Sequence, residues 1–179
     1  WIIGREDMYQ GEEVPASEER LAYLSGFTGS SGFAVVLRKI AGLFSDGRYT
    51  LQMETQTSKD DWQCCTIPTV TCEDWLKAAQ LPDGFTIGID GWLVTVSGFE
   101  EFERAIIAAG GKLVSHSENL LDGLWRDRPP LPLNEIWQIP TKFVGKTVTD
   151  KLDDLGKQIQ DNGCDGVLIT RVDSVNWLV

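Results

Sequence analysis

The spacing of apolar positions changes repeatedly along the first 116 residues of the chain. Short runs rich in β-branched and aromatic residues predict strands, and the amphipathic stretches between them predict helices. The predicted strands cover residues 1–3, 33–37, 43–45, 62–67, 85–90 and 112–115; the predicted helices pass through 21–24, begin near 48, and pass through 75–79 and 102–107. This alternation predicts an α/β domain with a partly parallel sheet, which the hairpin at 33–45 makes mixed.

Polar residues that accept hydrogen bonds from free backbone N–H groups indicate where several helices begin. Residues 15–17 offer a cap for the first helix. Thr71 with Asp74, and Ser97 with Glu100, have the spacing of capping boxes. We therefore expect helices to start just after Thr71 and Ser97.

A proline-rich stretch follows the predicted α/β domain and favours extended backbone. Beyond it, Thr147 precedes an amphipathic helix, and residues 166–170 predict a strand. These elements repeat the order found at the start of the chain. We expect an N-terminal domain at 1–128, a linker at 129–140 and the truncated start of a second, similar domain at 141–179.

Three blocks of sequence carry a resemblance to a known family. They are YLSGFTGSSGF with SDGRY within residues 23–49, ENLLDGLWRDRPP at 118–130, and VLITRVDSVNWL at 167–178. Together they closely resemble the N-terminal part of aminopeptidase P, the Xaa-Pro aminopeptidase of the creatinase and prolidase superfamily. The resemblance implies a mixed sheet flanked by helices, of the creatinase N-terminal and ribonuclease H-like type. It also implies that residues 118–130 are the family's exit segment, a short acidic helix that leads to Trp-x-Asp-Arg-Pro-Pro.

The resemblance also implies an activity for a longer parent protein. Such enzymes are metallopeptidases that release the N-terminal residue from peptides with proline second, using two divalent metal ions, expected to be manganese, in a C-terminal domain. We expect the present chain to hold neither metal nor catalytic residues, to be inactive alone, and to shape the substrate cleft and the contacts of a homodimer. The alternatives are the N-terminal domain of a prolidase or creatinase-type hydrolase and a non-catalytic peptide- or protein-binding module.

The family resemblance places the Ser45–Tyr49 segment beside the catalytic cleft. Arg48 would then offer its guanidinium to a carbonyl or carboxylate of the peptide substrate. Phe27 and Tyr49 would line the rim, unless they are core aromatics. A plain turn followed by a helix cap is the alternative interpretation of Asp46–Arg48.

Other motifs argue against further chemistry. The glycine-rich loop at 26–32 lacks the Gly-Lys-Ser/Thr ending of a phosphate-binding loop and precedes a predicted strand, so we expect a tight structural turn. His116 has no assignable nucleophile or orienting partner and is expected at the surface. The aromatic side chains of Trp92 and Trp125 are candidates for interface contacts. At the position of a histidine in many family members, this chain has Tyr9 or Gln10.

Composition narrows the classes of partner. The net charge of -11 argues against nucleic acid, which requires clustered Lys and Arg. No apolar run reaches the roughly 20 residues that span a membrane, so we expect a cytoplasmic protein. The four cysteines lack metal-ligand spacing and are expected to be reduced. Both ends fall in apolar segments, so we expect the chain to be part of a longer protein.

Overall fold

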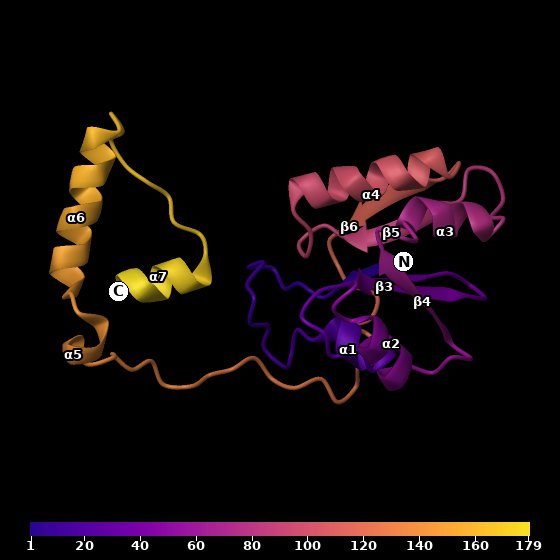
Figure 1. Ribbon diagram of the computed structural model, residues 1–179, viewed down its shortest axis with the longest axis horizontal. Coiled ribbons are helices and arrows are strands. Elements are labelled where there is room, and N and C mark those ends of the chain that lie inside the picture. Colours follow the sequence, from indigo (N-terminus) through magenta and orange to yellow (C-terminus); the bar gives the residue numbers. More distant parts are fainter. The chain divides into compact units, whose positions relative to one another are not determined.

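The computed structural model describes all 179 residues, which divide into two compact units, Trp1–Leu131 and Pro132–Val179. The first unit contains a six-stranded sheet with the order β4-β3-β2-β1-β5-β6 (Figure 1). Its elements are β1 (Ile2–Gly4), α1 (Arg20–Ser25), β2 (Phe33–Val36), β3 (Ala41–Asp46), α2 (Thr50–Gln56), β4 (Trp62–Ile67), α3 (Cys72–Ala78), β5 (Thr86–Asp90), α4 (Val96–Ala108) and β6 (Lys112–His116).

The sheet separates two apolar clusters because successive residues of a strand point to opposite faces. On one face, Leu76 of α3 and Ile106 of α4 pack with the sheet. On the other face, Leu21 of α1 and Met53 of α2 do so. Figure 1 shows these two pairs of helices on opposite sides of the sheet. The predicted mixed α/β architecture is confirmed.

The cysteines follow the same alternation. Cys64 and Cys65, adjacent on β4, belong to different clusters, and all four thiols are free, as predicted. Burial raises the pKa of Cys65 to about 11 and that of Cys72 to about 12. A thiol of this kind is a core side chain with little thiolate at neutral pH.

The directions of the strands determine which strand ends, and therefore which loops, share an edge of the sheet. β2 is antiparallel to both β1 and β3, whereas the pairs β1–β5, β5–β6 and β3–β4 are parallel. Five strands therefore run in the same direction, and only β2 runs against them. Their carboxyl ends lie at one edge of the sheet, together with the amino end of β2.

In the first unit, two predicted helix caps are wrong and one is confirmed. Thr71 and Asp74 form the expected capping box at α3. At α4, Thr95 is the cap and accepts a hydrogen bond from the Gly98 N–H at 3.1 Å, so the helix begins two residues before the predicted start. Residues 15–17 do not cap α1, which begins at Arg20 without a side-chain cap.

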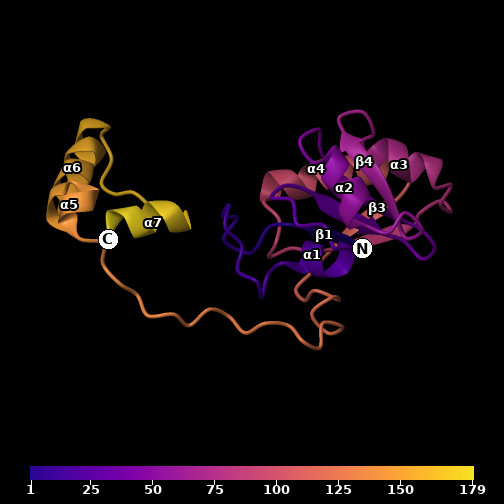
Figure 2. The same ribbon diagram turned by 60° about the horizontal axis from the view of Figure 1, so that its bottom comes forward.

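The second unit contains three helices, α5 (Thr141–Val144), α6 (Val148–Asp161) and α7 (Val172–Leu178). Thr147 caps α6, as expected, and the structure adds a capping box with Asp150. The predicted strand at 166–170 is wrong, and the segment is an extended connection between α6 and α7 (Figure 2). A strand needs a neighbouring strand for its backbone hydrogen bonds, and this unit provides only helices. None of the helices in the chain is both long and apolar enough to cross a bilayer.

Candidate functional site

A cleft of about 700 Å³ opens at the carboxyl edge of the sheet in the first unit. Open α/β sheets bind ligands in the crevice outside the carboxyl ends of their strands, because the loops that follow the strands present side chains and free backbone groups there. The cleft is lined by the ends of β1, β3, β4 and β5, by the first turn of α3 and by one side of α4. It is therefore the position in this fold that is best suited to binding.

Arg48 lies beside this cleft in a fixed geometry. Its Nε and one terminal nitrogen donate to the two carboxylate oxygens of Asp46, at 2.9 and 2.8 Å, and its backbone N–H donates to the same carboxylate at 3.0 Å. These hydrogen bonds lower the pKa of Asp46 to about 2. The Arg48 side chain is 69% exposed. A second terminal nitrogen of the guanidinium has no protein acceptor, so it is free to donate to a ligand.

The glycine-rich loop at 26–32 packs beside the Asp46–Arg48 pair through Phe27 and Tyr49. Phe27 is only 1% exposed and belongs to the core, so it supports the loop without forming its surface. Its ring meets that of Tyr49 edge-on at 5.7 Å. Gly29 crosses both rings so closely that a Cβ atom would lie 2.2 Å from Phe27. The loop leads into β2, as predicted, and glycine permits the close crossing.

Tyr49 is half-buried beside the arginine. Its hydroxyl forms a 2.8 Å hydrogen bond with the Ser30 hydroxyl, which lowers the pKa of Tyr49. The Arg48 guanidinium lies 5.1 Å from the centre of the Tyr49 ring, within the range of a cation–π contact. The structure therefore brings Arg48 and Tyr49 together on the surface and places Phe27 beneath them.

The exit segment is held by a cluster of four charged residues. Arg20 donates to both carboxylate oxygens of Asp122, at 2.6 and 2.9 Å, and to Glu18 at 2.6 Å. Arg128 contacts the same two carboxylates at 2.7 and 2.9 Å. Burial alone would raise the pKa of Asp122, but the hydrogen bonds and charges of the two arginines lower it overall. The cluster joins α1 to the exit segment.

Trp125 adds an aromatic contact between the exit segment and α1. Its ring is stacked on Tyr23 of α1 at 4.4 Å and is buried. The proposed interface role therefore does not suit Trp125, whereas Trp92 is 67% exposed. Residues 120–124 form turns, so the helix expected from the family pattern in this segment is wrong. The ion cluster and the ring stack fix the backbone together with local turn hydrogen bonds, such as those from the Leu124 and Trp125 N–H groups to the Leu121 carbonyl.

No group of three or more His, Cys, Asp or Glu side chains in the structure is arranged to hold a metal ion. His116 is exposed and its ring lies 4.9 Å from that of Trp1. The residues of this chain thus do not provide a two-metal centre, which the resemblance places in a C-terminal domain.

Comparison with known proteins decides the family. Residues 14–124 match the model described as the creatinase/prolidase N-terminal domain, and residues 127–179 match a second model of the same description. The chain belongs to the creatinase/prolidase N-terminal domain family. The Asp46–Arg48 pair, the glycine-rich loop and most of the cleft lining lie within the first matched region, whereas the cleft residues contributed by the β1 end precede it.

Relatives of this family member are similar over nearly its whole length. Aminopeptidase P1 of Lotus japonicus is 37% identical over 99% of the chain, and aminopeptidase P1 of Arabidopsis thaliana is 34% identical over 99%. The crystal structure of an X-prolyl aminopeptidase from Caenorhabditis elegans, a cytosolic enzyme with a di-nuclear active site, is 30% identical over 99% of the chain, with a TM-score of 0.82. The chain spans 27% of each plant relative and 29% of the nematode structure.

Sequence reasoning did not identify the side chains inside the cleft. Glu6, Asp90, Glu101 and Asn119 all line it, although they come from four separate segments. One signal was available for Asp90, because an acidic residue at the end of a buried strand lies at the ligand-binding edge of an α/β sheet. For the other three, only the three-dimensional arrangement reveals the shared location.

Proposed function

We propose that this chain is the non-catalytic N-terminal part of a metal-dependent Xaa-Pro aminopeptidase, which releases the N-terminal residue from peptides with proline second. The observation that carries the proposal is 37% identity to aminopeptidase P1 over 99% of the chain, supported by the TM-score of 0.82 with the nematode enzyme. Two divalent metal ions, which we propose to be manganese, would be held by residues outside this chain and would activate the attacking water.

The chain would shape the substrate cleft and orient the peptide. Arg48 is the residue we assign to direct contact, because Asp46 fixes its guanidinium while one terminal nitrogen stays free. An arginine held in this way loses less conformational freedom on binding, so a bound carbonyl or carboxylate is oriented at lower entropic cost. Tyr49 would line the rim beside it, and Phe27 would support both from the core.

Three further parts of the proposal concern organisation. We propose a homodimer, with the exposed Trp92 as a candidate contact, and a cytoplasmic location like that of the nematode relative. We also propose the domain division into 1–128, a linker at 129–140 and the start of a second domain at 141–179. Size-exclusion chromatography with light scattering, and limited proteolysis at 129–140, test the dimer and the linker.

The test uses the longer protein that contains this chain, purified and supplied with Mn²⁺, and peptides with proline or alanine in the second position. We expect release of the N-terminal residue only from the proline peptides, and no turnover by the 179-residue chain alone. Hydrolysis restricted to Xaa-Pro dipeptides would instead assign a prolidase. Absence of hydrolysis, with peptide binding retained, would assign a binding module.

The role of Arg48 is tested in the same protein with Arg48→Gln. Loss of a charged hydrogen bond to the substrate should lower kcat/KM about tenfold or more. Arg38→Gln is the matched control, because Arg38 is exposed in the β2–β3 turn at the opposite edge of the sheet. Equal kcat/KM values for the two variants would remove Arg48 from substrate binding.

A further inference from the structure

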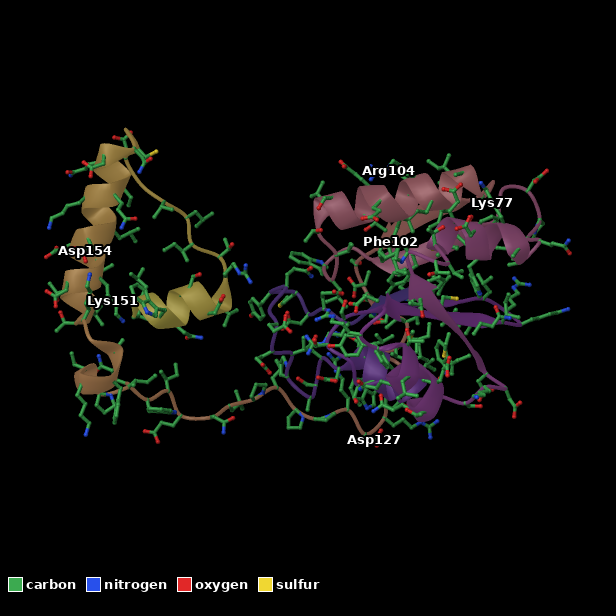
Figure 3. All side chains as sticks on the ribbon, viewed as in Figure 1. Lys77, Phe102, Arg104, Asp127, Lys151 and Asp154 are labelled. Atoms are coloured by element: carbon green, nitrogen blue, oxygen red, sulfur yellow. The ribbon has the colours of Figure 1, made fainter.

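The cleft carries more negative charge than the Asp46–Arg48 pair explains. Arg48 neutralises Asp46, and Lys77 on α3 neutralises Glu73. The cationic side chain that lines the cleft, Arg104, is exposed on α4 (Figure 3). The lining carboxylates that form no ion pair are those of Glu6, Asp90 and Glu101. The cleft is therefore electrostatically suited to a positively charged ligand.

Asp90 is the buried member of this set. It is the last residue of β5 and only 7% exposed. One carboxylate oxygen accepts the Trp92 N–H at 3.0 Å, and the other receives no hydrogen bond from the protein. This second oxygen still reaches solvent in the cleft, so it is available to accept a hydrogen bond from a cationic donor placed there.

Asn119 supplies a second side chain with a free hydrogen-bonding atom. It is 7% exposed and lines the same cleft. Its side-chain oxygen accepts the Leu121 N–H at 3.0 Å, whereas its amide nitrogen donates to no protein group and reaches solvent. A ligand that uses this amide brings an acceptor such as an amide carbonyl, in addition to a cation for Asp90.

The rest of the lining is apolar and suits an aliphatic stem. Ile2, Phe33, Ile89 and Phe102 line the cleft, and the Phe33 and Phe102 rings meet edge-on at 4.9 Å. The volume of about 700 Å³ lies within the range of small-molecule sites. A hydrated metal ion would leave these apolar walls unused, and the unpaired carboxylates repel anions.

The geometry points to a binding site for a basic residue of a peptide. The guanidinium or ammonium group binds Asp90, with Glu6 and Glu101 adding negative potential. The aliphatic stem lies against Ile89 and Phe102. The Asn119 amide donates to the backbone carbonyl of the same residue. This site is distinct from the contact assigned to Arg48 and does not depend on the aminopeptidase activity.

The experiment titrates the 179-residue chain with Nα-acetyl-L-arginine methylamide and follows amide chemical shifts by NMR. We expect saturable shifts at the ends of β1 and β5 and in α4 around Glu101 and Phe102. The citrulline counterpart has the same shape without the charge and should bind at least tenfold more weakly. Butylguanidine lacks the carbonyl and should also bind more weakly, because Asn119 would lose its acceptor.

Asp90→Asn is the decisive variant, since an asparagine oxygen still accepts the Trp92 N–H. It should weaken arginine binding at least tenfold and leave circular dichroism unchanged. If this variant does not fold, Glu101→Gln decides, with Glu100→Gln on the same helix but outside the cleft as its matched control. Equal binding of arginine and citrulline analogues, unchanged affinity in the decisive variant, or no binding at millimolar concentration would overturn the proposal.

Discussion

Replacing Arg20 with methionine tests whether the ion cluster, and not local helix formation, attaches the exit segment to α1. The Arg20 side chain is 6% exposed and donates to Glu18 and Asp122, whose side chains are 15% and 32% exposed. Methionine retains most of the apolar volume, so the main loss is the guanidinium. Removing one partner from a buried ion pair costs about 3–5 kcal/mol because the remaining charges stay buried.

The expected magnitude is at the lower end of that range. Arg128 still contacts both carboxylates in the variant, and Asp122 is about one-third exposed to screening solvent. We therefore expect a loss of about 3 kcal/mol in the free energy of unfolding. With a urea dependence of about 2 kcal/mol per molar, this loss lowers the midpoint by about 1.5 M.

The assay combines urea unfolding with hydrogen exchange of the exit segment. The amides of Leu124 and Trp125 both donate to the Leu121 carbonyl, so their exchange should accelerate in step with the loss of stability. Arg126→Met is the matched control because Arg126 is exposed and forms no ion pair. A loss in Arg20→Met that does not exceed that of the control would refute the assignment of stability to the cluster.

Three further predictions follow from individual contacts. The pKa of Asp122 is lower in the folded state than the unfolded value of about 3.9, so the stabilisation by ionised Asp122 is complete above that pH and is lost as pH falls through the folded pKa. Between about pH 5 and pH 2, wild type should therefore lose more of its free energy of unfolding than Arg20→Met. Urea unfolding at a series of pH values measures this difference. Gly29→Ala should destabilise by about 1–3 kcal/mol in urea, since its Cβ would overlap Phe27, whereas Gly47→Ala, with nothing within 4 Å, should be nearly neutral. Thr71→Ala should cost about 1 kcal/mol through loss of the α3 cap, visible as faster amide exchange in its first turn.

The sequence predicted those features that depend on local periodicity. Strand β4 matches its predicted range, 62–67, because alternation placed Cys64 and Cys65 on opposite faces and both faces are covered. The capping box at Thr71 and the helix cap at Thr147 were also predicted correctly, since their hydrogen bonds span only three residues. Features determined within one helical turn can be read from the order of residues alone.

The errors occur where distant groups decide the local structure. Residues 166–170 have the composition of a strand, but no neighbouring strand is present in their unit to accept the backbone hydrogen bonds. The family resemblance implied a short helix in the exit segment, but residues 120–124 form turns, and Arg20 holds Asp122 in an ion cluster across 102 residues of sequence. Both expectations were wrong where the deciding partner lies elsewhere in the fold or is absent from the unit.

The candidate site has the same dependence on long-range arrangement. Asp46 and Arg48 are two residues apart, so a turn that joins them was predictable, and the structure adds that the pair fixes the guanidinium. Asp90 and Asn119 are brought into one cleft only because β5 and β6 are parallel neighbours whose carboxyl ends meet. The two binding elements therefore differ in origin: one is encoded in a short motif, and the other is a product of strand order. A search for short motifs alone would detect the arginine contact and miss the acidic cleft beside it.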